Sequence, residues 1–296
     1  MARVKKELCA MRIGIRGALF GLLVVNASCA ADGNASGNDA PAAPETARGP
    51  LQSGYFPVGR TGVVQKVTYA VVDGENLFEG DIVLDREQGE GGGLRVQGLD
   101  TIDTNGVAIS GSSRRWSKKV VPYSIDSGLS DTARVTDAIA HWESKTDLTF
   151  VKRTSSNAGQ YPDYVVFRSG SGCSSTVGRK GGVQYVNLAS SCSKGNAIHE
   201  IGHSVGLWHE QSREDRDSFV TIQWDNIEEG MEHNFDRHVS DGDDIGNYDY
   251  GSIMHYGATA FSKNGEPTII TKNGTSIGQR TGLSTGDVSA VETLYP

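Results

Sequence analysis

The segment His199–His209 limits the folds open to this chain more than any other feature. It reads His-Glu-Ile-Gly-His-Ser-Val-Gly-Leu-Trp-His. His199 and His203 are four residues apart, so on a helix they share one face and can present imidazole nitrogens to one metal ion. Gly206 can adopt a positive φ, which ends the helix and turns the chain so that His209 returns as a third ligand. The fold must therefore contain a helix that stops beside a metal site.

The expected ligand set leaves one position on the metal open. Three protein nitrogens with an open position are typical of catalytic zinc, whereas four protein ligands close a structural zinc site. Glu200 lies beside the ligands, where its carboxylate can contact a metal-bound water rather than the metal. Zinc lowers the pKa of that water towards about 7, which makes hydroxide available at neutral pH. These residues predict a hydrolase with one zinc ion per chain, in which Glu200 is general base and then general acid.

Composition and charge exclude several classes of protein. The chain is 37% hydrophobic and 22% charged, which is ordinary for a globular protein in water. Its 28 basic and 36 acidic residues give a net charge of −8, so no basic excess attracts nucleic acid. No apolar run approaches the roughly 20 residues that a membrane-spanning helix needs. We therefore expect no nucleic-acid partner and no stable membrane insertion.

The first 30 residues are typical of a secretory signal peptide. Basic residues precede a short apolar run at 17–25, and small residues follow that run. Cleavage after Ala30 would leave a free, soluble chain. Cleavage before Cys29 would leave a lipid-modified N-terminus, although Asn26 stands where that signal prefers an aliphatic residue. We expect residues 1–30 to direct the chain to a secreted or extracellular location, with a periplasmic or surface-anchored one as the alternative.

The rest of the chain divides by composition into a first part with few apolar residues and a second part with more of them. Residues 31–50 have little to bury and predict a flexible linker. The stretch 62–110 contains only short β-like runs, at 63–72 and 82–84, and is too poor in apolar residues for a core of its own. Further along, hydrophobic spacing predicts strands at 119–125, 148–152, 164–167 and 181–188, and helices at 132–145, 197–208 and 285–294. This order of elements indicates an α+β fold.

Two stretches together resemble the astacin family of secreted zinc endopeptidases, within the metzincins. They are residues 199–217, HEIGHSVGLWHEQSREDRD, and residues 252–257, SIMHYG. The resemblance extends from about Trp116 to Tyr295, so residues 107–296 are expected to be the catalytic domain. It implies a two-lobed zinc protease of the α+β class, whose N-terminal lobe has a twisted mixed sheet and helices. Its C-terminal lobe would be largely irregular with a closing helix, and its substrates would be proteins or peptides.

The resemblance assigns roles to residues outside the histidine segment. Tyr256 matches an additional zinc ligand that leaves the metal when substrate enters and then donates a hydrogen bond to the oxyanion. Met254 matches the methionine of a turn beneath the zinc site. Glu210 matches a buried partner of the new N-terminus, which is expected near Val107 after activation. Arg280 matches a basic residue that favours an acidic residue after the scissile bond, the alternative being a solvated loop arginine.

A second resemblance lies upstream, in residues 78–82, which read Phe-Glu-Gly-Asp-Ile. It is similar to the pro-segment motif of the family, whose aspartate binds zinc in the zymogen and displaces the catalytic water. The matching residue here is Asp81, and a carboxylate is a competent zinc ligand. We therefore expect residues 31–106 to be a linker and inhibitory pro-segment, with Asp81 as the zinc switch. On its own, Asp81 would be read as a turn residue.

Two cysteines, Cys173 and Cys192, remain after the predicted signal segment. In an oxidising compartment they most simply form one disulfide, and they lack the close spacing of a thiol zinc site. Members of the family commonly carry a second disulfide, but Asp147 stands where one of its cysteines is expected. Its partner is missing as well, so we expect a minimal secreted form without that bridge.

Alternatives to a zinc protease assign the same residues different tasks. The helix could be an ordinary amphipathic one whose histidines face solvent. A secreted zinc-containing binding protein with a protease-like fold would not catalyse, but it would be expected to lose Glu200 or a ligand. Hydrolysis of a non-peptide substrate is compatible with the same metal site, because a fold does not determine a substrate. The signal and pro-segment together favour the protease, since both suit a destructive enzyme.

Overall fold

The computed structural model describes residues 49–58, 63–84, 108–109, 112–238 and 242–296, which all lie in one compact unit, Asp39–Pro296. The expected signal peptide with Cys29, and the expected mature start at Val107, lie outside the described residues. No helix in the described part of the chain is long and apolar enough to cross a bilayer.

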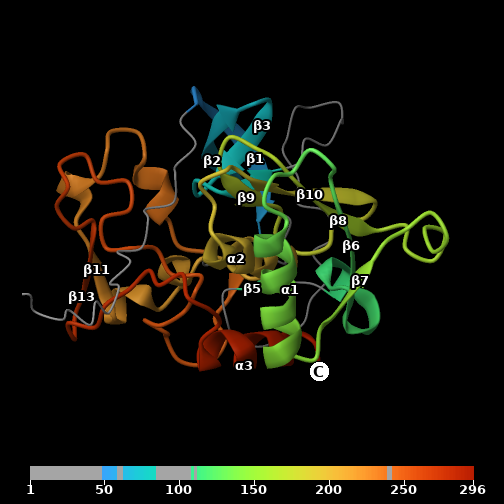
Figure 1. The fold of residues 1–296 in the computed structure, drawn as a ribbon. Coiled ribbons are helices and arrows are strands. Elements are labelled where there is room, and N and C mark those ends of the chain that lie inside the picture. Colours follow the sequence, from blue (N-terminus) through green and yellow to red (C-terminus); the bar gives the residue numbers. More distant parts are fainter. Residues whose placement is uncertain (1–48, 59–62, 85–107, 110–111, 239–241) are drawn as a thin grey trace, which may run out of the picture. The chain divides into compact units, whose positions relative to one another are not determined.

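One mixed sheet of nine strands, in the order β1-β2-β3-β4-β9-β10-β8-β6-β7, organises the fold (Figure 1). Its strands, in the order of the sequence, are β1 (Leu51–Val58), β2 (Val63–Val72), β3 (Glu75–Phe78), β4 (Ile82–Leu84), β6 (Val120–Ile125), β7 (Thr149–Lys152), β8 (Tyr164–Arg168), β9 (Cys173–Ser175) and β10 (Val183–Leu188). The strands β6, β7, β8 and β10 pair in parallel, whereas β9 is antiparallel to β10. β4 pairs in parallel with β9 through Ile82 and Ser175. The strands β1 to β4 of the expected pro-segment therefore extend the sheet of the expected catalytic domain.

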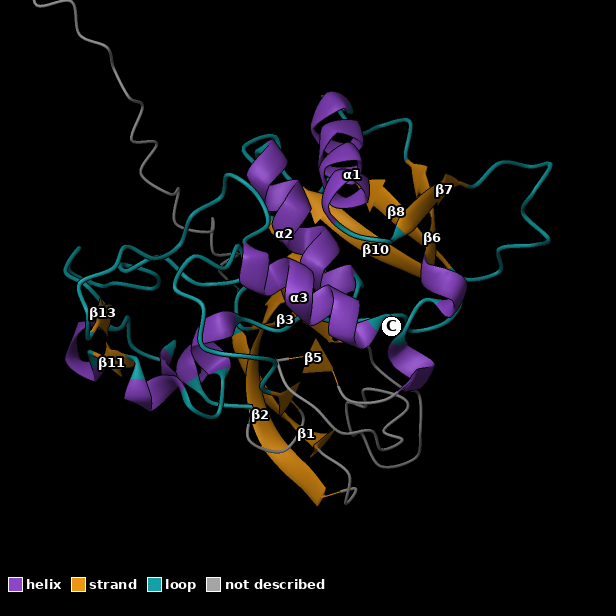
Figure 2. Cartoon of the chain, turned by 90° about the horizontal axis from the view of Figure 1, so that it is seen from below, coloured by secondary structure: helices purple, strands orange, loops and turns teal. Residues whose placement is uncertain are grey.

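Two helices, α1 (Ala133–Lys145) and α2 (Lys194–Ser204), pack against each other on one face of the sheet (Figures 1 and 2). Val135 and Trp142 of α1 are fully buried, as the helical spacing of its apolar residues predicts. The Trp142 indole nitrogen donates a hydrogen bond to the carbonyl oxygen of Ile198 at 3.0 Å, which links the two helices inside the core. Because α2 carries the metal-ligand motif, this packing fixes the position of the site.

The chain after α2 is largely irregular. It contains a two-stranded sheet, β11 (Val220–Ile222) with β13 (Ile269–Thr271), and it closes with α3 (Thr285–Leu294). Its strand β12 (Gly242–Asp243) pairs with β5 (Ala108–Ile109), which lies earlier in the chain. Short 3-10 helices occur at Ser112–Arg114, Ser117–Lys119, Glu210–Ser212, Arg216–Ser218, Trp224–Asn226 and Glu232–Phe235. Phe235 and Tyr256 are fully buried in a separate core of this part. The arrangement confirms the expected α+β class.

Helix α2 differs at both ends from the helix expected at 197–208. It begins at Lys194 because Ser193 and Asn196 form a capping box that satisfies backbone N–H groups at its start. It ends at Ser204 because Gly206, with φ of 112°, turns the chain, and its N–H bonds to the carbonyl of His203 at 2.8 Å. The local turn chemistry therefore outweighs the apolar periodicity that continues to Trp208.

The segment with few apolar residues obtains its core from the rest of the chain. Side chains of β2, β3 and β4 form one buried cluster with two residues of the later part; its members are Tyr69, Phe78, Ile82, Leu84, Val177 and Trp208. The prediction that residues 62–110 could not build an independent core is compatible with this arrangement. The sequence did not predict that the segment packs against Val177 and Trp208 or that it pairs with strand β9.

Candidate metal centre

Two elements bring the three histidines together. His199 and His203 lie on the same face of α2, with ring centroids 4.7 Å apart. After Gly206 the chain reverses, and the N–H of Leu207 bonds to the carbonyl of Gly202 at 2.9 Å. This turn returns His209 to the helix, with its ring centroid 4.7 Å from that of His203. The motif thus gathers three imidazoles without help from distant segments.

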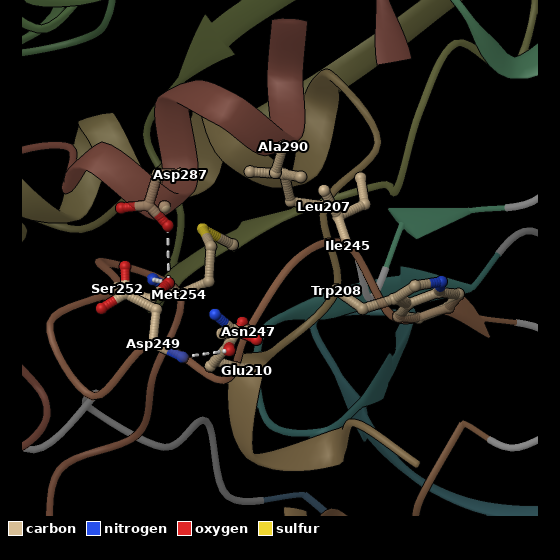
Figure 3. Close-up of a pocket in the computed structure, with 11 residues that line it drawn as sticks. Leu207, Trp208, Glu210, Ile245, Asn247, Asp249, Ser252, Met254, Asp287 and Ala290 are labelled. Atoms are coloured by element: carbon tan, nitrogen blue, oxygen red, sulfur yellow. Dashed lines mark hydrogen bonds between the residues drawn. The ribbon is translucent and has the colours of Figure 1, made fainter. Parts of the chain in front are cut away.

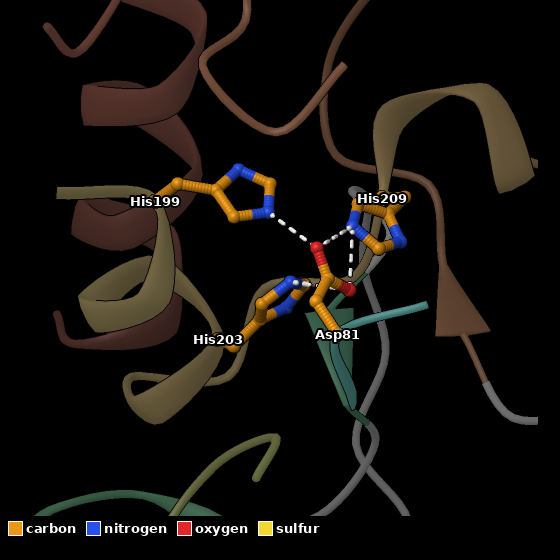
Figure 4. Close-up of side chains that lie close together, drawn as sticks. All are labelled: Asp81, His199, His203 and His209. Atoms are coloured by element: carbon orange, nitrogen blue, oxygen red, sulfur yellow. Dashed lines mark hydrogen bonds and ion pairs between the residues drawn. The ribbon is translucent and has the colours of Figure 1, made fainter. Parts of the chain in front are cut away.

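A fourth side chain, that of Asp81, lies among the three imidazoles (Figure 4). Its Oδ2 is 3.2 Å from His199 Nε2 and 3.3 Å from His209 Nε2, and its Oδ1 is 3.6 Å from His203 Nε2. One ligand atom from each of the four residues lies within 4.8 Å of the others, and all four residues are buried. A residue that is remote in the sequence therefore closes the cluster that the motif builds.

The donor set fits a zinc ion. Asp81 Oδ1 and His203 Nε2 are buried and have no hydrogen-bond partner among the residues that the structure describes. Leaving such atoms unpaired costs about 1–3 kcal/mol each, and a metal ion between them would remove that cost. Imidazole nitrogen and carboxylate oxygen are both ordinary zinc ligands, and four of them suit a tetrahedral ion.

The outward-facing nitrogen of each histidine also has a partner. His199 Nδ1 lies 2.8 Å from the carbonyl of Ile253, and His203 Nδ1 lies 2.8 Å from the carbonyl of Leu207. A carbonyl can only accept, so these two Nδ1 atoms carry the protons and leave Nε2 free for a metal. His209 Nδ1 is 2.8 Å from the carboxylate of Glu79. These contacts set the direction in which the imidazoles point.

Glu200 lies on α2 directly after the first histidine and is 1% exposed. Its Oε2 is buried without a hydrogen-bond partner in the described part of the chain. Burial and the nearby charge of Asp81 raise the pKa of Glu200 well above its usual value, while Arg280 opposes that rise. A carboxyl group with a raised pKa suits an exchange of protons near neutral pH.

Three comparisons with known proteins agree with this geometry. A sequence model of the astacin family of peptidases matches residues 108–296. Zinc metalloproteinase nas-13 of Caenorhabditis elegans is 40% identical over 235 residues, which are 74% of this chain and 50% of that protein. Among solved structures, high choriolytic enzyme 1, a hatching enzyme zinc-protease from Oryzias latipes, has a TM-score of 0.57 and 37% identity, covering 64% of this chain and 98% of its own. The chain belongs to the astacin family.

The astacin-family match leaves part of the chain, and of its relatives, uncovered. Blastula protease 10 of Paracentrotus lividus is 38% identical over 228 residues, which are 74% of this chain and 38% of that protein. The chain therefore spans half or less of the length of the two curated relatives described here. Asp81 precedes the family match, which begins at residue 108, yet it lies inside the histidine cluster.

Two further residues singled out by the resemblance to astacins lie beside the cluster. Tyr256 is fully buried, with its ring centroid 4.6 Å from that of His209, and its hydroxyl donates a hydrogen bond to the backbone carbonyl of Glu79 at 2.6 Å. Met254 is buried against α2, because a Cβ atom built on Gly202 would lie only 2.5 Å from its sulfur. Met254 therefore packs directly beneath the helix that carries His199 and His203.

Arg280 lies beside the segment that contains Met254. Its Nη1 donates hydrogen bonds to the carbonyls of Ile253 and His255 at 2.8 and 3.1 Å. Its charge acts on the carboxylates of Asp81 and Glu200. Since Ile253 also holds His199, one backbone segment positions both a predicted zinc ligand and the arginine.

Glu210 faces a small cavity of about 30 Å³ on the other side of the motif (Figure 3). The cavity is lined by residues of the turn after α2, of the segment 245–254 and of α3, among them Trp208, Asp249 and Asp287. Glu210 Oε1 accepts a hydrogen bond from the Asp249 N–H at 2.7 Å. Burial raises the pKa of Glu210 to about 8, against the opposing charge of Arg213.

The two cysteines form the expected disulfide, between Cys173 in β9 and Cys192 just before α2. It ties the strand that pairs with the pro-segment to the start of the helix that carries the histidines. Asp147, which stands where the family often has another cysteine, instead lies 3.4 Å from the amino group of Lys119 in an exposed ion pair.

The sequence did not point to three buried residues beside the metal cluster, Glu79, Ser212 and His238. Glu79 lies within the motif that identified Asp81, but only the aspartate had an assigned role. Its carboxylate contacts His209, Ser212 and His238, of which the last two were not singled out. Glu79 and Asp81 lie in the turn between β3 and β4, and no pattern in the sequence could show what this turn meets.

Proposed function

We propose that this protein is a zinc-dependent endopeptidase that is made in a latent form. One observation carries the proposal: a buried Glu200 lies beside a cluster of three histidines whose fourth place is taken by a carboxylate from an upstream segment. The cluster supplies three nitrogens from the family-matched part of the chain. The fourth ligand comes from residues that can leave, which is what an open catalytic position requires.

The residues around the cluster have different roles in the proposed reaction. A zinc ion held by His199, His203 and His209 would supply Lewis-acid activation of the peptide carbonyl and of the attacking water. Glu200 takes the proton of that water and returns it to the departing amine, so it serves as base and then as acid. Tyr256 donates its hydroxyl hydrogen bond to the developing oxyanion once it is released from Glu79.

Latency depends on Asp81 in this proposal. Its carboxylate fills the place at which water and substrate would otherwise meet the metal. Strand β4, which follows it, pairs with β9, so Asp81 is delivered by the sheet rather than by a loose loop. Removal of the segment 31–106 would open the site.

Processing near Val107 would create a new amino terminus, which we propose enters the cavity beside Glu210. The two described residues that follow Val107 are Ala108 and Ile109, which begin the family-matched part and pair with Gly242–Asp243. A buried amine would stabilise the carboxylate form of Glu210, whose pKa is raised while no amine is there. N-terminal sequencing of the active protein tests this, and a start beyond Trp116 would exclude the arrangement.

The proposed enzyme is exported from the cytoplasm. Residues 1–30 would direct the chain out of the cytoplasm, where the Cys173–Cys192 disulfide can form. We propose a secreted protein that acts on extracellular proteins or peptides. Mass spectrometry of the secreted chain would detect a start after Ala30, or alternatively a lipid on Cys29.

The direct test is digestion of casein by the activated protein, with and without a zinc chelator. We expect cleavage that stops with the chelator and returns when zinc is added back. A chain that binds zinc stoichiometrically but leaves casein and a peptide library intact would instead be a non-catalytic zinc-binding protein with a protease-like fold.

A further inference from the structure

Glu79 is a buried carboxylate that contacts one histidine of the metal cluster and two residues outside it. Its side chain is 0% exposed. One oxygen, Oε2, lies 2.8 Å from His209 Nδ1, and the other, Oε1, accepts from Ser212 Oγ at 2.8 Å and lies 2.9 Å from His238 Nε2. Glu79 is therefore a buried carboxylate with both oxygens in use.

The backbone is bent to place this carboxylate. Glu79 has φ of 47° and Gly80 has φ of 79°, so two successive residues adopt the left-handed conformation. For a residue with a side chain, this conformation is strained. The bend allows Glu79 and Asp81 to contact different nitrogens of His209, Nδ1 and Nε2. Such a strained conformation persists only where the surrounding contacts hold the backbone in it.

The three zinc-binding candidates differ in what supports them. His199 and His203 are oriented by the carbonyls of Ile253 and Leu207, which belong to the family-matched part of the chain. His209 is oriented by Glu79, which lies before that part. A carboxylate raises the basicity of an imidazole ligand more than a neutral carbonyl does, because it stabilises the positive charge that the ring shares with the metal.

We propose that Glu79 is a positioning residue for zinc binding, which orients and strengthens His209 as a ligand only while the pro-segment is in place. This inference rests on the proposed function and extends it, since the segment would then both block the metal and help to load it. Processing removes one ligand, Asp81, and at the same time the charged partner of another. The full-length chain should therefore bind zinc more tightly than the processed chain, and the difference should exceed what the loss of Asp81 alone would cause.

The test is zinc affinity of the full-length chain, measured by competition with a chromophoric chelator, which requires no catalytic activity. Loss of an outer partner of a metal-bound histidine typically weakens binding by about 10–100-fold, so we expect that range for Glu79→Ala. Glu79→Gln keeps the volume and one acceptor, and it should fall between Glu79→Ala and wild type. If Glu79→Ala folds poorly, Glu79→Gln alone tests the proposal. A change below about threefold in both variants would overturn the proposal.

Glu75→Gln is the matched control, because Glu75 anchors the same segment elsewhere. It accepts hydrogen bonds from Arg168 at 2.6 Å and from Asn187 at 2.7 Å, and in the described part of the chain it touches no histidine of the cluster. Its zinc affinity should equal that of wild type. A loss as large as that of Glu79→Gln would mean that any loosening of the segment weakens zinc binding, which contradicts a specific role for Glu79.

A second comparison separates Glu79 from Asp81. In the Asp81→Ala background, Glu79→Ala should still weaken zinc binding by a similar factor, because its effect passes through His209. If the effect disappears in that background, Glu79 acts only by holding Asp81, and the proposal is wrong. In the zinc-loaded chain, the Nδ1 proton of His209 should resonate far downfield in NMR spectra and move upfield in Glu79→Gln. Absence of peptidase activity with these results intact would reject the proposed function but not this inference.

Discussion

Glu200 shows how one carboxylate can sit beside a metal cluster without joining it. Its neighbours on α2 point their imidazoles at Asp81, while its own Oε2 finds no partner among the described residues. We expect Glu200→Ala to keep the fold and about one zinc ion per chain. Its kcat should fall by at least the roughly 10²–10⁴-fold that general acid–base catalysis contributes. Metal analysis and peptide hydrolysis on the same sample check this, and joint loss of zinc and activity would make Glu200 a ligand instead.

Arg280 is the predicted specificity residue, and this role stays a prediction. Its guanidinium is held by the backbone carbonyls of Ile253 and His255, and Ile253 also holds His199. We expect a peptide library to show Asp or Glu enriched just after the cleaved bond. The preference should weaken by about 1.5–3 kcal/mol in Arg280→Ala, the value of a hydrogen bond to a charged group. Enrichment of small apolar residues there in wild type would place Arg280 outside the pocket.

At the scale of elements, the first turn of α2 is joined to the segment that carries Arg280. A Cβ atom on Gly195 would lie 1.7 Å from the backbone oxygen of Arg280, so this helical position has no room for a side chain. Gly195→Ala should lower the stability by about 1–3 kcal/mol despite the better helix propensity of alanine, because backbone cannot move aside cheaply. Thermal unfolding measures the loss. Gly159→Ala, where a Cβ would meet nothing within 4 Å, is the control and should be nearly neutral.

The sequence predicted those helices and strands well whose position is set by their own residues. The helix at 285–294 is found as α3, with Ser284 and Asp287 forming its capping box. The strand expected at 119–125 begins one residue later, because Lys118 and Lys119 both have positive φ. Strand β9 was not predicted, since it is only three residues long and its identity depends on its neighbours in the sheet. Short strands have too few residues for a pattern to show.

At the scale of the whole molecule, the candidate site could be predicted only in part. The histidine motif is local, so its three imidazoles and Glu200 follow from spacing and one glycine turn. The arrival of Asp81 followed from a resemblance, because a contact across 118 residues leaves no periodic signal in the sequence. Glu79 had no such signal, because only the fold brings it near His209, Ser212 and His238.

The proposed latency belongs to the whole chain, and it can be tested with Asp81→Ala in the full-length protein. Because Asp81 is the only part of the described segment 63–84 within the candidate metal cluster, its loss should raise activity before processing. Activity against a quenched peptide is compared with that of the processed wild type. A variant that folds normally and remains fully latent would show that another residue blocks the site.

The cluster shared by β2 to β4 with Val177 and Trp208 has a consequence for solubility. When the upstream segment departs, two large apolar side chains and the hydrogen-bonding edge of β9 lose their cover together. Exposed edges and apolar patches favour association between copies. Residues 107–296 refolded without the segment should therefore aggregate at lower concentration than the full chain, as light scattering would reveal. The segment proposed to block the metal site would then also act as an internal chaperone during folding.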